Sequence, residues 1–144
     1  PRMYDEDSCK KLRIGKGSIL REGSDVAIIS CGVMVSESIK AAEYLFSKGI
    51  SAAVVDMHTL KPLDKDLIDE LADTCKGIVT AEDHSVIGGL GSAVAEHLSS
   101  RGDTPMRMVG VSDRFGESGT PEQLMESLGM THKDIVNSCE SLVS

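Results

Sequence analysis

Residues 80–91 join an acidic, histidine-bearing stretch to a run of glycines, and they carry the groups in this chain best suited to chemistry. Glu82, Asp83 and His84 set carboxylates beside an imidazole, the pairing used in general acid and base catalysis. Adjacent residues seldom point at one atom, however, and a single histidine in an acidic loop is more often a surface or interface residue. We therefore expect these three residues to lie in an acidic loop that contributes to a contact surface.

The glycines that follow, Gly88, Gly89 and Gly91, lead directly into a helical pattern. Backbone amides at such a helix start can bind an anion, but glycines also make tight turns between a strand and a helix. The spacing differs from the Gly-x-Gly-x-x-Gly of dinucleotide sites, and no acidic residue ends a following strand. The pattern favours the tight turn, with Gly89 in a backbone conformation closed to other residues.

A third candidate is the stretch 113–119, Asp-Arg-Phe-Gly-Glu-Ser-Gly, which mixes opposite charges with one of the two Phe residues of the chain. A large ring in a glycine-bearing loop indicates a contact surface, in which Phe115 supplies apolar area while Arg114 and Glu117 fix the register. The alternative, equally supported, is a connection whose phenylalanine plugs the edge of the sheet.

Cys31 and His58 each follow a predicted strand and are weaker candidates. No histidine lies near Cys31 in the sequence, and a buried cysteine usually acts as a small apolar residue. The four cysteines are widely spaced and include no Cys-x-x-Cys pair, which argues against a zinc site and a dense disulfide framework. We expect reduced thiols and a cytoplasmic location.

Charge and composition narrow the range of partners. With 15 basic and 23 acidic residues, the chain has a net charge of -8, which repels nucleic-acid backbones and anionic lipids. The absence of Trp, with only two Phe and two Tyr, leaves few rings for stacking on bases. No apolar run approaches the roughly 20 residues that cross a bilayer. We expect neither a nucleic acid nor a membrane as partner.

The elements that must position these residues are visible as four short apolar runs. The runs are continuous rather than alternating, as in parallel strands buried on both faces: 26–29, 52–55, 78–80 and 106–111. Helical patterns separate them, and an irregular strand is predicted within 12–20. This order predicts a three-layer α/β/α sandwich around a mostly parallel sheet of about five strands. Residues 12–144 form this domain, and 1–11 read as a linker from an upstream domain.

Capping signals place the helices along the chain. Ser36 is predicted to cap a helix that ends at Gly49, with Ile39, Ala42, Leu45 and Phe46 on its inner face. Asp64 caps the next, with Leu67, Ile68, Leu71, Ala72 and Cys75 inside. Thr120 begins a helix that Gly129 closes, and 131–134 begin the last one.

Seven segments coincide in order and spacing with one family. They are 14–17, 20–23, 25–32, 60–64, 80–84, 88–91 and 113–119. On these segments the chain resembles the C-terminal domain of transketolase, the third domain of a thiamine-diphosphate enzyme, over nearly its whole length. The stretch 113–119 and Glu-Asp-His favour transketolase over the β subunit of 2-oxoacid dehydrogenase E1 and over deoxyxylulose-phosphate synthase, which share the domain.

The resemblance implies transfer of a two-carbon ketol unit between sugar phosphates, with thiamine diphosphate held by Mg or Ca in the two preceding domains. No catalytic, cofactor-binding or metal-binding residue of the family matches a position here, so the chain alone is expected to be inactive and to bind no cofactor. The implied partners are the N-terminal cofactor-binding section, the pyrimidine domain and a second copy in a homodimer. Because the chain begins with Pro1, we expect a split subunit or an excised piece of a longer polypeptide.

Two other functions stay open. One is a section of an E1 β subunit that docks an acyltransferase core. The other is a free nucleotide-binding α/β domain, which would need a ligand at the turn 88–91.

Overall fold

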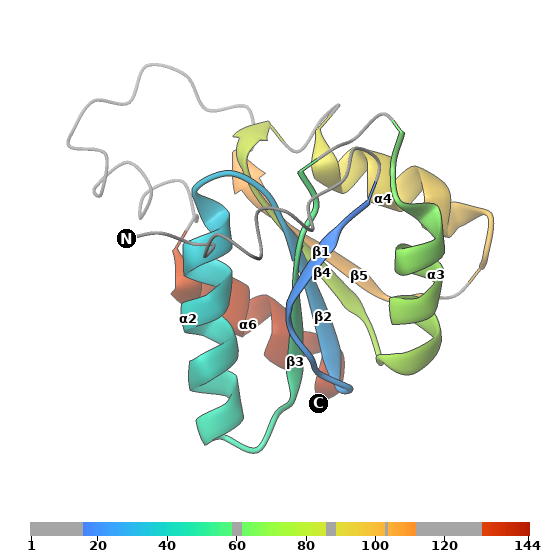
Figure 1. Cartoon of the computed structure of the whole chain (residues 1–144). Helices are drawn as coiled ribbons and strands as arrows, with labels where there is room; N and C mark the ends of the chain where they lie inside the picture. Colours follow the sequence, from blue (N-terminus) through green and yellow to red (C-terminus); the bar gives the residue numbers. More distant parts are fainter. Residues whose placement is uncertain (1–15, 59–61, 86–88, 103, 112–130) are drawn as a thin grey trace.

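The computed structural model describes residues 16–58, 62–85, 89–102, 104–111 and 131–144 (Figure 1). In these ranges the chain forms β1 (Ser18–Arg21), β2 (Val26–Ser30), α2 (Met34–Ser47), β3 (Ala52–Asp56), α3 (Lys65–Thr74), β4 (Ile78–Ser85), α4 (Leu90–Ser99), β5 (Met106–Val111) and α6 (His132–Val143). The five strands form one sheet in the order β1-β3-β2-β4-β5, with helices on both faces. The predicted three-layer sandwich is confirmed.

The sheet is parallel apart from its β1 edge. β2 pairs in parallel with both β3 and β4, β4 pairs in parallel with β5, and β1 is antiparallel to β3. Every residue of β2 and β3 is buried, as expected for strands covered on both faces. The predicted linker 1–11, the start of the predicted first strand and the predicted helix 120–129 lie outside the described residues.

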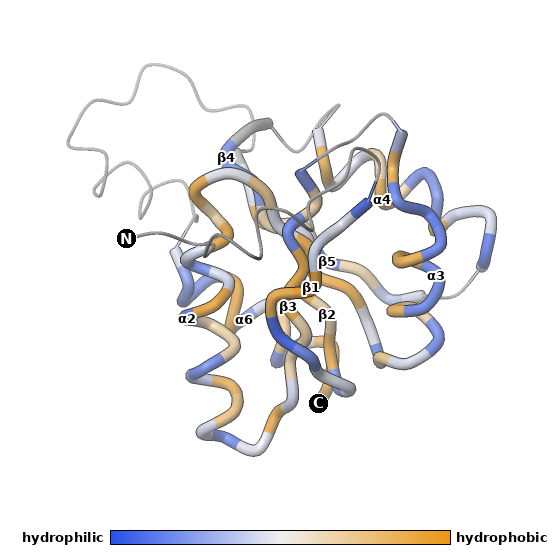
Figure 2. Tube along the Cα trace, viewed as in Figure 1, coloured by the Kyte–Doolittle hydropathy of each residue, from blue (hydrophilic) through white to orange (hydrophobic). Residues whose placement is uncertain are grey.

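Two hydrophobic cores lie on opposite faces of the sheet, and alternate residues of β2 contribute to each. Val26 and Ile28 pack with α2 and α6, whereas Ala27 and Ile29 pack with α3 and α4. Figure 2 shows hydrophobic residues concentrated along the central strands, while hydrophobic and hydrophilic residues alternate along the helices. Within the described ranges, no helix combines the length and apolar character needed to cross a bilayer.

Helix starts were predicted well where the capping signal is local. Asp64 caps α3, since its Oδ1 accepts a hydrogen bond from the Leu67 amide at 3.2 Å. Thr131 and Asp134 form a capping box at the start of α6. The same reasoning was wrong at Ser36, because α2 begins earlier, with Val33 as its N-cap. Ser36 lies inside the helix, where its hydroxyl donates to the Val33 carbonyl at 3.1 Å.

The inner face of α2 was also predicted with one error. Phe46 is 68% exposed rather than buried. It lies in the last turn of the helix, with its ring centroid 5.5 Å from the Arg21 guanidinium of β1. This cation–π contact gives the ring a partner on the edge strand instead of a place in the core.

The Asp64 cap gives a first testable prediction. Asp64 is 7% exposed, and its second oxygen, Oδ2, accepts from the Gly17 amide at 2.9 Å, so it also ties α3 to the segment before β1. Asp64→Ala should lower the free energy of unfolding in urea by about 1–2 kcal/mol. The control is Asp66→Ala, an exposed acid in the same first turn, which should cost no more than about 0.5 kcal/mol. Equal losses in the two variants would mean that charge near the helix start, and not the cap, is what matters.

Candidate functional site

The candidate site lies at the carboxyl ends of the neighbouring strands β2 and β4, where the order of the strands in the sheet changes direction. The chain runs from β2 to β3 on one side and from β4 to β5 on the other. Ligands of open α/β sheets bind in the crevice at such a point. Cys31 and Gly32 follow β2 there, and Glu82 and Asp83 lie in the last part of β4. We take this crevice as the candidate site.

The prediction that Glu82, Asp83 and His84 lie in a loop was wrong, because β4 continues through Ser85. The added length is irregular: after the Ala81–Val109 pair, the register against β5 shifts before Ser85 meets Val111. Neighbouring side chains along a strand point in opposite directions. Accordingly, Glu82 turns to the start of α4 and Asp83 to Gly32. The side chain of His84 lies outside what the structure describes.

Glu82 is the best-defined polar group of the site. It is 0% exposed, and its two carboxylate oxygens accept hydrogen bonds from the first amides of α4: Oε1 from Leu90 and Oε2 from Gly91, each at 2.7 Å. Short, charge-assisted bonds to helix N-terminal amides stabilise a carboxylate, and the helix dipole adds to the effect. The two helix-start amides suited to an external anion are therefore occupied by the chain's own side chain.

The conformational reason that we predicted for the glycines of this turn does not account for them. Gly89 has φ -98°, so the prediction that it adopts a conformation closed to other residues was wrong. Gly91 is needed for close approach instead: a Cβ there would lie 2.9 Å from Met108 Sδ and 3.1 Å from Thr80 Oγ1. The missing side chain lets the first turn of α4 rest directly on β4 and β5.

Gly32 is a site residue that the sequence reasoning missed. Its φ of +63° is in the left-handed region, and an added Cβ would lie 2.9 Å from Asp83 Oδ1. A glycine two residues after the end of a buried strand was the available signal. Gly32 thus allows the Asp83 carboxylate to lie against the backbone that follows β2.

Cys31 is half-buried beside these carboxylates. Burial first, and then the charges of Glu82 and Asp83, raise the pKa of its thiol to about 11. The thiol is therefore protonated at neutral pH, which disfavours a nucleophilic role.

The raised pKa of Cys31 predicts slow alkylation. From the ordinary value of 9.0 to about 11, the thiolate fraction at pH 7.5 falls about 100-fold. Because a thiolate of higher pKa is also a better nucleophile, the rate with iodoacetamide should fall by about 10-fold or more. Peptide mapping by mass spectrometry measures the rate in the native protein. Urea-unfolded protein is the control, in which Cys31 should react at an ordinary rate. Equally fast reaction in both states would show that the pKa of the native thiol is not raised, and faster reaction in the native state would show that the thiol is activated.

Asp56 lies at the end of the neighbouring strand β3, and His58 lies two residues beyond it. Asp56, the last residue of β3, is 8% exposed, and burial raises its pKa while the neighbouring His58 partly opposes the shift. His58 itself is exposed. Within the described ranges, no group of three or more His, Cys, Asp or Glu side chains could hold a metal ion.

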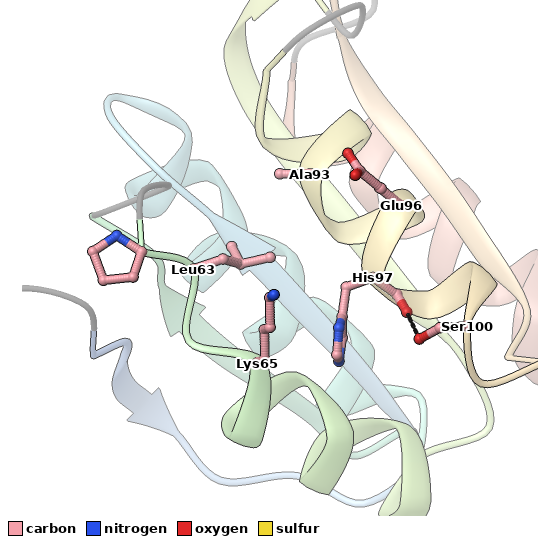
Figure 3. Close-up of a pocket in the computed structure, with 7 residues that line it drawn as sticks. Leu63, Lys65, Ala93, Glu96, His97 and Ser100 are labelled. Carbon is pink, nitrogen blue, oxygen red and sulfur yellow. Dashed lines mark hydrogen bonds between the residues drawn. The ribbon is translucent and has the colours of Figure 1, made fainter.

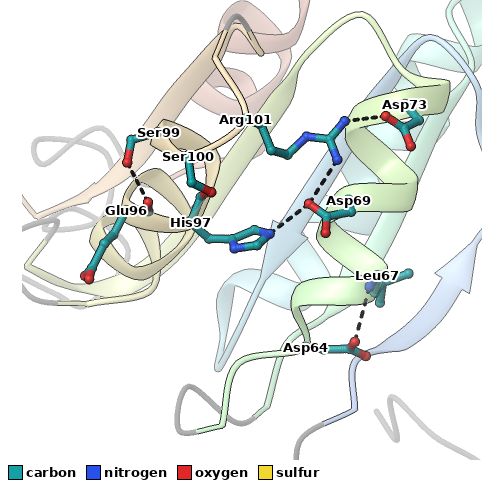
Figure 4. Close-up of polar contacts among 9 residues, drawn as sticks. All are labelled: Asp64, Leu67, Asp69, Asp73, Glu96, His97, Ser99, Ser100 and Arg101. Carbon is teal, nitrogen blue, oxygen red and sulfur yellow. Dashed lines mark hydrogen bonds and ion pairs between the residues drawn. The ribbon is translucent and has the colours of Figure 1, made fainter.

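A separate cleft of about 590 Å³ lies between α3 and α4 (Figure 3). Its lining comprises Pro62, Leu63, Lys65, Ala93, Glu96, His97 and Ser100. His97 is anchored there, because its Nε2 lies 2.8 Å from Asp69 Oδ1, and Arg101 Nη1 lies 3.0 Å from the same oxygen (Figure 4). The His97 hydrogen bond and the Arg101 contacts lower the pKa of Asp69. Since Arg101 also pairs with Asp73, this network ties the two helices together.

The other predicted site residues, Gly88, Arg114, Phe115 and Glu117, lie outside the described residues. The contact surface made by the loops at 82–88 and 113–119 therefore stays a prediction.

The comparisons with known proteins agree with this fold. Residues 15–135 match the family model described as transketolase, C-terminal domain. A 6-deoxy-6-sulfo-D-fructose transketolase subunit from Clostridium sp. (strain MSTE9) is 47% identical over 99% of this chain and 44% of its own length. A putative transketolase C-terminal section from Methanocaldococcus jannaschii is 41% identical over 92% of this chain and 42% of its own length.

A 1-deoxy-D-xylulose-5-phosphate synthase from Chlorobium luteolum is 44% identical over 83% of this chain and 19% of its own length. Among solved structures, a chain titled split gene transketolase, inactive beta4 tetramer superposes with a TM-score of 0.93 and 45% identity. The match covers 99% of this chain and 46% of that one. The present chain thus spans less than half the length of these transketolase relatives.

Proposed function

Since this chain belongs to the transketolase C-terminal domain family, we propose that it is a section of an enzyme that transfers a two-carbon ketol unit between sugar phosphates with thiamine diphosphate. The observation that carries the proposal is the match of 99% of the chain, at a TM-score of 0.93, to 46% of a split-gene transketolase chain. The proposal assigns the rest of the enzyme, which this domain does not cover, to a companion section on the same or another chain.

The residues of this domain that the structure describes offer no site that fits the cofactor. Thiamine diphosphate needs a site for a pyrophosphate and a divalent metal, and the two amides best placed for an anion at the switch point bind Glu82. We assign the cofactor and its Mg or Ca to the companion sections. The same occupancy counts against the alternative of a free nucleotide-binding domain with its ligand at the turn 88–91.

The role that we propose for this domain is to support the neighbouring pyrimidine domain and to help the enzyme form its homodimer. The solved relative, of which this chain covers 46%, is titled an inactive beta4 tetramer, which supports the expectation that a section without its companion is inactive. Cys31, Cys75 and Cys139 are free thiols, which suits the proposed cytoplasmic setting.

Reconstitution tests the proposal. The chain, its N-terminal companion section and their mixture are each assayed for ketol transfer with thiamine diphosphate and Mg. We expect activity only in the mixture, because the proposal places the cofactor site and the supporting domain in different sections of the enzyme. Sugar-phosphate donors and 6-deoxy-6-sulfo-D-fructose are tested side by side, since a close relative is named for the latter.

Calorimetric titration with thiamine diphosphate and Mg forms the second arm. The chain alone should show no saturable binding in the micromolar range. Saturable binding by the chain alone, or ketol transfer without the companion, would overturn the assignment of the cofactor site to the companion sections. Decarboxylation of a 2-oxoacid by the mixture, in place of ketol transfer, would instead identify the E1 β alternative.

A further inference from the structure

Glu82 is a carboxylate with no exposed surface, in a position where open α/β folds bind external anions. Burying a charge is costly unless hydrogen bonds compensate for it. Here the compensation comes from the start of α4, a helix of 10 residues, through the amides of Leu90 and Gly91 at 2.7 Å each. Because each oxygen accepts a hydrogen bond from a separate N–H, the two amides bind the carboxylate in a bidentate manner.

A further polar group, the Thr80 hydroxyl, lies near this pair of amides. Thr80 is 0% exposed, and its hydroxyl has no hydrogen-bond partner within the described ranges. Its Oγ1 lies 3.1 Å from the position that a Cβ on Gly91 would occupy, so this hydroxyl borders the helix turn that holds Glu82. This buried hydroxyl makes no hydrogen bond to the Glu82 carboxylate and is left as an unused donor beside the turn.

We infer that the start of α4 is an anion-binding site whose resident ligand is the Glu82 side chain, and that it binds a free carboxylate of acetate size when that side chain is removed. Glu82→Ala deletes a CH2–COO⁻ group, which has the size and shape of acetate. The variant keeps the two amides and the Thr80 hydroxyl in place. The inference is independent of the enzyme's reaction.

Thermal unfolding in the presence of sodium acetate tests the inference, with sodium chloride at equal ionic strength as the reference. A ligand that binds only the folded state raises stability by RT ln(1 + [L]/Kd). At acetate ten times above its Kd, the Tm of the Glu82→Ala chain should rise by about 4 °C relative to chloride. The wild type, whose site is filled, should show no such difference.

Two comparisons separate specific binding from general salt effects. Sodium sulfate stabilises most proteins by exclusion from their surface, so the quantity compared is the difference between variant and wild type. That difference should be larger for acetate than for sulfate or propionate. No acetate effect, or the same effect in the wild type, would overturn the inference, and an equal difference with sulfate would overturn the preference for a carboxylate.

If Glu82→Ala does not remain folded, the yield of refolding from urea takes the place of Tm. Acetate should then increase the yield over chloride, and equal yields would contradict the inference.

Amide exchange in the wild type gives an independent measurement. The amides of Leu90 and Gly91 should exchange far more slowly than the first amides of α6, where Thr131 and Asp134 form an ordinary capping box. Exchange as fast as that of a frayed helix start would also count against the site.

Discussion

Replacing Gly23 with alanine is expected to lower the free energy of unfolding by about 2–4 kcal/mol. An added Cβ would lie 2.2 Å from both the carbonyl carbon of Ala52 and the amide nitrogen of Ala53. These are backbone atoms at the start of the buried strand β3, so no side-chain rotation relieves the overlap. Relief requires movement of β3, which is held by its register with β2, including the Val26–Ala52 and Ala27–Ala53 pairs.

Urea unfolding measures this loss, and Gly49→Ala is the matched control. Gly49 has φ +83°, but nothing lies within 4 Å of an added Cβ there. That variant should therefore show only the backbone cost of a left-handed alanine, about 1 kcal/mol. If Gly23→Ala loses no more than Gly49→Ala, the loop before β2 must adjust more easily than its contacts indicate.

The second large effect is expected for Glu82→Gln, with a loss of about 3 kcal/mol. Glutamine keeps the shape of glutamate but replaces one acceptor oxygen with an NH2 group. That NH2 would face a backbone N–H, either of Leu90 or of Gly91, in a site with no exposure to water. The change removes the charge from both hydrogen bonds and leaves one buried amide without an acceptor.

Glu43→Gln, an exposed substitution on α2, is the control for a general charge effect and should stay within about 0.5 kcal/mol of the wild type. Both variants carry the same change in net charge, so a difference between them measures the hydrogen bonds of Glu82. Equal stabilities, measured by urea unfolding at pH 7, would mean that the start of α4 reorganises without cost. The Glu82 contact would then have no part in fixing the candidate site.

The sequence by itself determined the architecture, because its signals are local or periodic. Continuous apolar runs gave the buried parallel strands, since a strand covered on both faces has no polar side. The helix starts at Asp64 and Thr131 followed from side chains that bind amides only a few residues ahead. Such capping hydrogen bonds can be predicted from the sequence because the amide that the side chain binds lies a few residues further along the same chain.

Only the tertiary structure decided what the candidate residues contact. Glu82 read as part of an acidic loop, but it belongs to an extended β4 and binds α4 across eight or nine residues of sequence. Gly91 was assigned to a turn, whereas the close approach of Thr80 and Met108 leaves no room for a side chain at this position. Phe46 fitted the helical period of the core, yet Arg21 of a distant strand holds it at the surface. In each case the partner is set by how strands and helices stack, and no local pattern specifies which backbone or side chain will be brought alongside.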